Sequence, residues 1–283
     1  MTYNKDNPLR VCSLCAGYDS QCLALERIKE NNPDFEYELV AWAEFDPQSN
    51  SPLEKQPAVL AHNALFPQWK DRNWGDLTKI DWERVPDFDM LFASVPCQSI
   101  SAAGLQHGFA KGSGTRSSII WNVHDCVRIK QPKYIIMENV SAILSNKFFP
   151  VLKIWMDGVE RMGYVNFMPK SYETPWNGGH TKDGCMNSKY YGIAQNRERW
   201  FMVSIRCTDE EPNPRYQFPK PFKLETCLAD VLEEDAEESL FLRDEMLARF
   251  CIKSIEQDSE STDSQVGDDD IEEEDYDGYF FGM

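Results

Sequence analysis

Short apolar runs alternate with helical patterns over the first 207 residues of the chain. The predicted buried strands are residues 9–14, 37–43, 88–95, 134–137 and 200–205. The predicted helices, with apolar residues at helical spacing, are residues 21–29, 119–127 and 151–162, the first of them capped by Ser20. Because strands and helices alternate, the sequence predicts an α/β fold with a mostly parallel central sheet.

Three segments depart from this alternation. Residues 104–118 are rich in Gly, Ser and Lys and lack an apolar period, which predicts a mobile surface loop. A proline-rich linker over 213–221 is followed by helical spacing over 228–255 and by an acidic run. We therefore expect a folded domain over 1–224, a helical segment over 225–257 and a disordered acidic tail over 258–283.

The charge is distributed unevenly along the chain. Residues 225–283 hold 21 of the 47 acidic residues and 3 of the 29 basic residues, which gives this segment the whole net charge of −18. The first 224 residues hold 26 of each and are balanced. The acidity of the chain as a whole therefore does not exclude a basic cleft for nucleic acid in the folded domain.

Composition and cysteine usage narrow the class of protein. With 42% hydrophobic and 12% aromatic residues, the chain has enough apolar mass for a core. It has no apolar run near the roughly 18 residues of a membrane span, and its polar start lacks a signal core. Nine cysteines favour free thiols in a reducing cytoplasm. Cys12 and Cys15 have CxxC spacing but no second pair, so we expect no metal site.

Polar residues follow several predicted strands. Parallel strands bind ligands at their carboxyl ends, where Gly17 would permit close backbone approach and Glu44 would suit ribose hydroxyls. Asp76 could accept a hydrogen bond from an adenine amino group. Cys97 could be a catalytic nucleophile or a buried structural cysteine. Glu138 could be the acid partner of Cys97 or an ordinary surface carboxylate. Together these residues suggest covalent catalysis with acid assistance.

Seven motifs, in order, make the sequence resemble the cytosine-5 DNA methyltransferases. They are Leu14-Cys15-Ala16-Gly17, Glu44, Gly75-Asp76, residues 96–104 (PCQSISAAG), Thr115-Arg116-Ser117, Glu138-Asn139-Val140 and residues 191–199 (YGIAQNRER). The resemblance covers about residues 9–250 and implies a Rossmann-like S-adenosylmethionine-dependent methyltransferase fold for residues 1–224. It also implies a cytoplasmic, prokaryotic or phage-encoded enzyme that methylates DNA, as restriction-modification enzymes do.

The resemblance implies a role for each matching residue. Cys97 would attack carbon 6 of a flipped cytosine, Glu138 would hydrogen-bond the ring, and Arg197 and Arg199 would hold the nucleotide. The residues implied to bind S-adenosyl-L-methionine are Leu14, Ala16, Gly17, Glu44, Phe45, Asp76, Leu77 and Pro96. Residues 106–118 match the loop that closes over the flipped base.

Two departures from the family pattern leave alternatives open. Cys15 replaces an aromatic residue, and Asp19 stands in place of a glycine, where it could meet the charged amino-acid end of the cofactor. Beyond residue 255, the acidic tail stands where the family has a recognition domain and a Gly-Asn motif. The chain could be half of a split enzyme with a second polypeptide, an inactive truncated homologue acting as an interaction protein, or a minimal enzyme. One branch of the family modifies tRNA, which makes tRNA the alternative substrate to DNA.

Overall fold

The computed structural model describes residues 3–100, 107–174, 179–233, 236–237, 241–243 and 246. The chain divides into two compact units, residues 1–231 and residues 232–283, and the elements below belong to the first. Within the described part of the chain, no helix has the length and apolarity that crossing a membrane requires.

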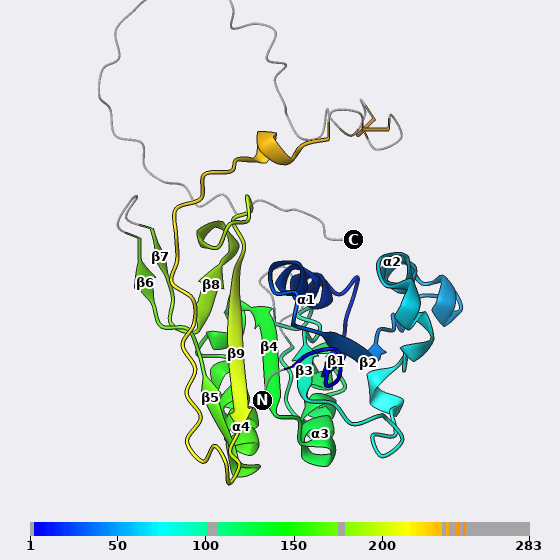
Figure 1. Ribbon diagram of the computed structural model, residues 1–283, viewed down its shortest axis with the longest axis vertical. Coiled ribbons are helices and arrows are strands. Elements are labelled where there is room, and N and C mark those ends of the chain that lie inside the picture. The colour runs from blue at the N-terminus through cyan, green and yellow to red at the C-terminus, as the bar shows by residue number, and fades with distance from the viewer. Residues whose placement is uncertain are drawn as a thin grey trace, which may run out of the picture. The chain divides into compact units, whose positions relative to one another are not determined.

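The first unit is built on a seven-stranded sheet of mixed direction (Figure 1). Its strands are β1 (Leu9–Leu14), β2 (Tyr37–Ala43), β3 (Met90–Ala93), β4 (Tyr134–Val140), β5 (Tyr164–Phe167), β8 (Cys185–Asn187) and β9 (Glu198–Arg206). In the order β2-β1-β3-β4 the strands pair in parallel, and β9 joins β4 antiparallel. β5 and β8 both pair with β9, and a separate hairpin pairs β6 (Tyr172–Glu173) with β7 (His180–Thr181). The start of β9 therefore meets the carboxyl ends of the parallel strands at one edge.

Helices cover both faces of this sheet. They are α1 (Ser20–Asn31), α2 (Pro57–Leu65), α3 (Ile120–Lys130) and α4 (Phe149–Arg161). One apolar cluster packs α3 and α4 on β3 and β4, with Val123, Trp155 and Ile135 fully buried. A second cluster packs α1 and α2 on β1 and β2, around Cys22 and Trp42. The layered α/β arrangement predicted from the sequence is confirmed.

The bounds of several elements differ from those predicted. Residues 9–14 and 37–43 form strands as expected, but β3 covers only four of the eight residues predicted, because the flanking Phe88 and Val95 are buried without being paired in the sheet. The prediction that Ser20 caps α1 is wrong. Asp19 caps it, because its side chain accepts from the Cys22 amide, and Ser20 is the first helical residue.

The loop predicted over 104–118 and the region predicted over 225–283 are described only in part. Residues 101–106, which include Gln106, lie outside the described residues. Phe109, in the segment predicted as a mobile surface loop, is buried in the core against Phe148. Of the helical segment predicted over 225–257, Leu228–Val231 forms a 3-10 turn, and most of the rest, like the acidic tail, lies outside the described residues.

Candidate active site

A cavity of about 330 Å³ lies at the carboxyl ends of β1, β2 and β3. Five of the eight predicted cofactor residues line it: Glu44, Phe45, Asp76, Leu77 and Pro96. Leu14 and Ala16 are instead buried in the apolar clusters. Gly17, which has a φ of 58°, contributes through its backbone rather than as a lining residue.

Glu44 joins the turns that follow β1 and β2. One of its carboxylate oxygens, Oε2, accepts a hydrogen bond of 2.7 Å from the Gly17 amide. Burial raises the pKa of Glu44, while hydrogen bonds from the Gly17 and Phe45 amides and the charge of Arg116 oppose that rise. The carboxylate thus fixes the glycine turn against the cavity.

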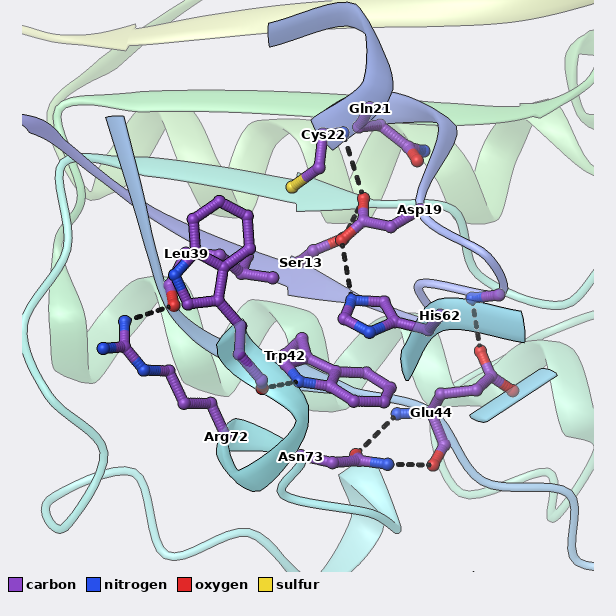
Figure 2. Close-up of polar contacts among 12 residues, drawn as sticks. Ser13, Asp19, Gln21, Cys22, Leu39, Trp42, Glu44, His62, Arg72 and Asn73 are labelled. Atoms are coloured by element: carbon purple, nitrogen blue, oxygen red, sulfur yellow. Dashed lines mark hydrogen bonds and ion pairs between the residues drawn. The ribbon is translucent and has the colours of Figure 1, made fainter. Parts of the chain in front are cut away.

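Asn73 is hydrogen-bonded to the backbone of Glu44 (Figure 2) and to the backbone of Gly75, which also lines the cavity. Its Oδ1 accepts from the Glu44 amide at 3.2 Å and from the Gly75 amide at 2.8 Å. Its Nδ2 donates to the Glu44 carbonyl at 3.4 Å. Asn73 was not among the predicted site residues, although it lies only two residues before the Gly75-Asp76 motif.

Asp76 is held by its own turn. Its Oδ1 accepts from the Thr78 amide at 3.0 Å and from Thr78 Oγ1 at 2.7 Å, and its Oδ2 lies 3.0 Å from Lys79 Nζ. Burial works to raise the pKa of Asp76, but the hydrogen bonds from Thr78 and Lys79 outweigh it and lower the pKa. The side chain therefore faces the cavity as an ionised hydrogen-bond acceptor.

The two unusual residues of the first turn lie in different places. Cys15 lines the cavity, and burial raises the pKa of its thiol, which disfavours a thiolate there. The expectation that Asp19 meets the cofactor is wrong, because its side chain is fully buried and turned toward Ser13 and Cys22. A carboxylate in the interior is placed to hold the turn rather than to contact a ligand.

Glu138 and Arg199 form an ion pair at the same edge of the sheet. The pairing of β4 with β9 sets Val140 opposite Arg199, which brings Arg199 Nε within 3.3 Å of Glu138 Oε1. Burial raises the pKa of Glu138, and the charges of Arg199 and Arg197 oppose the rise. The protonated form of Glu138 is thus favoured relative to an ordinary glutamate, which suits an acid.

Cys97 lies in the segment that follows β3, and hydrogen bonds from other segments hold the residues around it. Ser117 Oγ donates to the Pro96 carbonyl at 2.7 Å and accepts from the Ser99 amide at 3.2 Å. Asn139 Nδ2 donates to the Val95 carbonyl at 3.1 Å. Ser117 and Asn139 belong to motifs found in the sequence, but their positioning roles were not predicted.

Cys97 and the two arginines complete the group of predicted catalytic residues. Burial and the charge of Arg197 lower the pKa of Arg199, and the charges of Glu138 and Cys97 oppose that lowering. Arg197 is exposed, and its backbone amide donates to Asn187 Oδ1 at 3.1 Å. The structure therefore brings a thiol, a carboxyl and two guanidinium groups to one edge of the sheet.

Comparison with known proteins places the sequence among enzymes that act on cytosine. It matches the model of the C-5 cytosine-specific DNA methylase family over residues 9–277. The type II methyltransferase M2.ScrFI of Lactococcus lactis subsp. cremoris is 34% identical over 178 residues, which are 63% of this chain and 44% of that protein. The orphan methyltransferase M.Rho11sI of Bacillus phage rho11s is 30% identical over 198 residues, 70% of this chain and 33% of that protein.

Solved structures share the fold at low sequence identity. A mutant of Spodoptera frugiperda DNMT2 aligns with a TM-score of 0.58 and 16% identity, covering 86% of this chain and 65% of that one. The Entamoeba histolytica methyltransferase EhMeth aligns with a TM-score of 0.56 and 15% identity, covering 85% and 65%. The chain spans less than half the length of the two curated relatives described above.

Proposed function

We propose that this chain, which belongs to the C-5 cytosine-specific DNA methylase family, transfers a methyl group from S-adenosyl-L-methionine to carbon 5 of cytosine in DNA. The observation that carries the proposal is the Glu138–Arg199 ion pair, which lies at the edge of the sheet where Cys97 follows β3 and where the cavity opens. An acid and a thiol together are what the addition of a nucleophile to a pyrimidine ring requires.

The cavity fits S-adenosyl-L-methionine in size and in chemistry. Its volume of about 330 Å³ is typical of small-molecule sites. Glu44 and Asp76 supply acceptors for hydroxyl and amino groups, while Phe45, Leu77 and Pro96 supply apolar surface. When bound, the cofactor supplies an electrophilic methyl group. Leu14, Ala16 and Gly17 would shape the site through the backbone of the first turn.

Cys97 begins the proposed reaction on the cytosine. Its thiolate forms a bond to carbon 6 while Glu138 hydrogen-bonds nitrogen 3, so that electron density gathers at carbon 5. Carbon 5 would take up the methyl group, whose bond to sulfur breaks so that S-adenosyl-L-homocysteine leaves. Transfer of the carbon-5 proton to water or hydroxide would then re-form the double bond and release Cys97 as the leaving group, while the proton shared with nitrogen 3 returns to Glu138. Burial raises the pKa of Glu138, which favours the protonated form that would hydrogen-bond nitrogen 3.

Arg197 and Arg199 have distinct tasks in this proposal. Arg199 orients Glu138 through their ion pair, while exposed Arg197 is free to meet a phosphate or the flipped base. Extruding a cytosine from the duplex costs on the order of a few kcal/mol. Contacts from these guanidinium groups would offset part of that cost.

The test is methyl transfer from labelled S-adenosyl-L-methionine to mixed-sequence duplex DNA, with bulk tRNA as the competing substrate. We expect labelled 5-methylcytosine in DNA, and we expect Cys97→Ser to abolish it with cofactor affinity and Tm unchanged. Transfer to tRNA alone would contradict the DNA substrate. If no labelled product forms but the cofactor still binds, the result would favour a second polypeptide for target recognition. If neither methyl transfer nor cofactor binding is detected, the result would favour an inactive homologue.

A further inference from the structure

Asp19 is a buried carboxylate in the turn that borders the proposed cofactor cavity. Its backbone is left-handed, with φ 63° and ψ 60°, a conformation that aspartate tolerates better than most residues. Its Oδ1 accepts from Ser13 Oγ at 3.1 Å and from the Cys22 amide at 3.3 Å. The side chain has no exposed surface. A carboxylate so far from water needs a compensating partner.

His62 provides the facing group. Its Nε2 lies 3.6 Å from Asp19 Oδ2, and its side chain is also fully buried (Figure 2). Of the basic side chains that the structure describes, His62, which is cationic only when protonated, is the one recorded within ion-pair distance of Asp19. Asp19 Oδ2 and both ring nitrogens of His62 are buried and have no hydrogen-bond partner among the described residues. His62 lies on α2, which comes after β2 in the chain, whereas Asp19 lies in the turn after β1.

The imidazole is fixed by aromatic packing. His62 stacks on Trp42 with ring centroids 3.6 Å apart and an interplanar angle of 13°, and it contacts Phe66 at 5.3 Å. Trp42 Nε1 in turn donates to the Trp69 carbonyl at 2.9 Å. The ring that faces Asp19 therefore has little freedom to move away from it.

The first turn is consequently held from two sides. On the cavity side, Glu44 binds the Gly17 amide, and on the core side Asp19 binds Ser13 and faces His62. We propose that Asp19 and His62 form a positioning pair, in which His62 compensates the buried Asp19 carboxylate and so holds the turn in the shape that an S-adenosyl ligand requires. This inference rests on the proposed function for its ligand.

The first variant removes the compensation and keeps the packing. His62→Phe preserves a ring on Trp42 but leaves the carboxylate of Asp19 unopposed. We expect the Kd for S-adenosylhomocysteine, measured by calorimetry, to rise about tenfold. In the methyl-transfer assay the KM for S-adenosyl-L-methionine rises while kcat is unchanged. A loss of folded protein alone would lower kcat and leave the KM unchanged.

The second variant tests whether the charge is the cause. Adding Asp19→Asn to His62→Phe removes the unopposed charge and keeps an acceptor for Ser13 and Cys22, so we expect most of the affinity to return. Ser204→Ala is the control, because it deletes a buried hydrogen bond to Asn166 on β9. We expect that control to lower Tm without changing the Kd.

Hydrogen exchange of the ligand-free protein separates this inference from the proposed function. We expect the backbone amides of residues 17–22 to exchange faster in His62→Phe and to recover in the double variant. Unchanged exchange in His62→Phe, or a double variant worse than the single one, would overturn the pair, whether or not the wild type binds the ligand. If His62→Phe does not fold, a folded double variant supports the inference and an unfolded one contradicts it.

Discussion

Around the cavity, polar side chains are bonded to the protein itself: Glu44 to Gly17, Asn73 to two backbone segments, and Asp76 to Thr78. Across the same edge, Glu138 and Arg199 each remain about a quarter exposed, and Arg197 is exposed. The polar groups of the proposed cofactor side are therefore held by hydrogen bonds to the protein's own backbone. The proposed catalytic side keeps charged groups at the surface, where a nucleotide would meet them.

Glu138→Gln should show the largest effect of the changes that separate the two sides. The amide keeps the shape of the side chain but has no acidic proton to share with nitrogen 3. We expect kcat for methyl transfer to fall about 10²- to 10⁴-fold with the KM for cofactor unchanged. A comparable rise in that KM would show that the two sides are not separate.

Glu44→Gln is the matched change on the cofactor side. Its Oε1 can still accept from Gly17, but the bond loses its charge assistance, and the new amide group cannot accept from a hydroxyl. We expect the Kd for S-adenosylhomocysteine to rise about tenfold with kcat preserved. Calorimetry and initial-rate kinetics measure the two quantities. An effect confined to kcat would place Glu44 on the catalytic side instead.

The sequence was sufficient for β1, β2, β3, β4 and β9 and for α1, α3 and α4, but it did not predict α2, β5 or β8. Apolar runs specified β1 and β2 to the residue, because both strands are buried along nearly their whole length. The strands and motifs also brought Cys97 and Glu138 to one edge, since parallel strands end together. β3 was overestimated because the apolar run continues through Val95, which is buried but not paired as a strand.

The supporting contacts could not be read from the sequence, because they join segments far apart in the chain. His62 lies 43 positions from Asp19, and Asn73 lies 29 positions from Glu44. A histidine in the apolar stretch 57–65, or an asparagine in the polar stretch 70–76, does not by its position indicate which group it faces. The role of Asp19 was wrongly predicted for the same reason, since its direction depends on what α2 places behind the turn.

Asn73→Ala tests whether this supporting layer controls affinity. The change leaves the Glu44 and Gly75 amides without their acceptor, so the backbone segments at Glu44 and at Gly75 are no longer linked through one side chain. We expect the Kd for S-adenosylhomocysteine to rise a few-fold, about 3 to 10, and the free energy of unfolding to fall by about 1–3 kcal/mol. Denaturant unfolding and calorimetry give both values.

Asn166→Ala is the control for Asn73→Ala. Asn166 also makes several amide hydrogen bonds, to the Met156 carbonyl, Glu160 Oε1 and Ser204 Oγ, but it lies on β5. We expect a similar loss of stability with an unchanged Kd. Equal weakening of cofactor binding by both variants would mean that general stability, rather than the link through Asn73, sets the affinity.

The smallest expected effect concerns the pH dependence of stability. Glu44→Gln and Glu138→Gln should both stabilise the folded protein near neutral pH, but by different amounts. Burial raises the pKa of both Glu44 and Glu138. Above the ordinary carboxyl pKa the folded chain then holds protons that the unfolded chain has released, so stability falls as pH rises through the folded-state pKa. Either substitution by glutamine removes this slope, and the variant gains stability near neutral pH, by no more than about 1 kcal/mol or 2–4 °C in Tm.

The gain should differ between the two variants. Glu138→Gln leaves Arg199, whose side chain is only about a quarter exposed, without its ion-pair partner, which offsets part of the benefit. The Gly17 amide that faces Glu44 is neutral. Thermal melts from pH 4 to 8 should therefore show a larger gain for Glu44→Gln, and both gains should vanish toward pH 4. A gain that grows on acidification would reverse the sign and contradict burial as the dominant influence on these carboxyls.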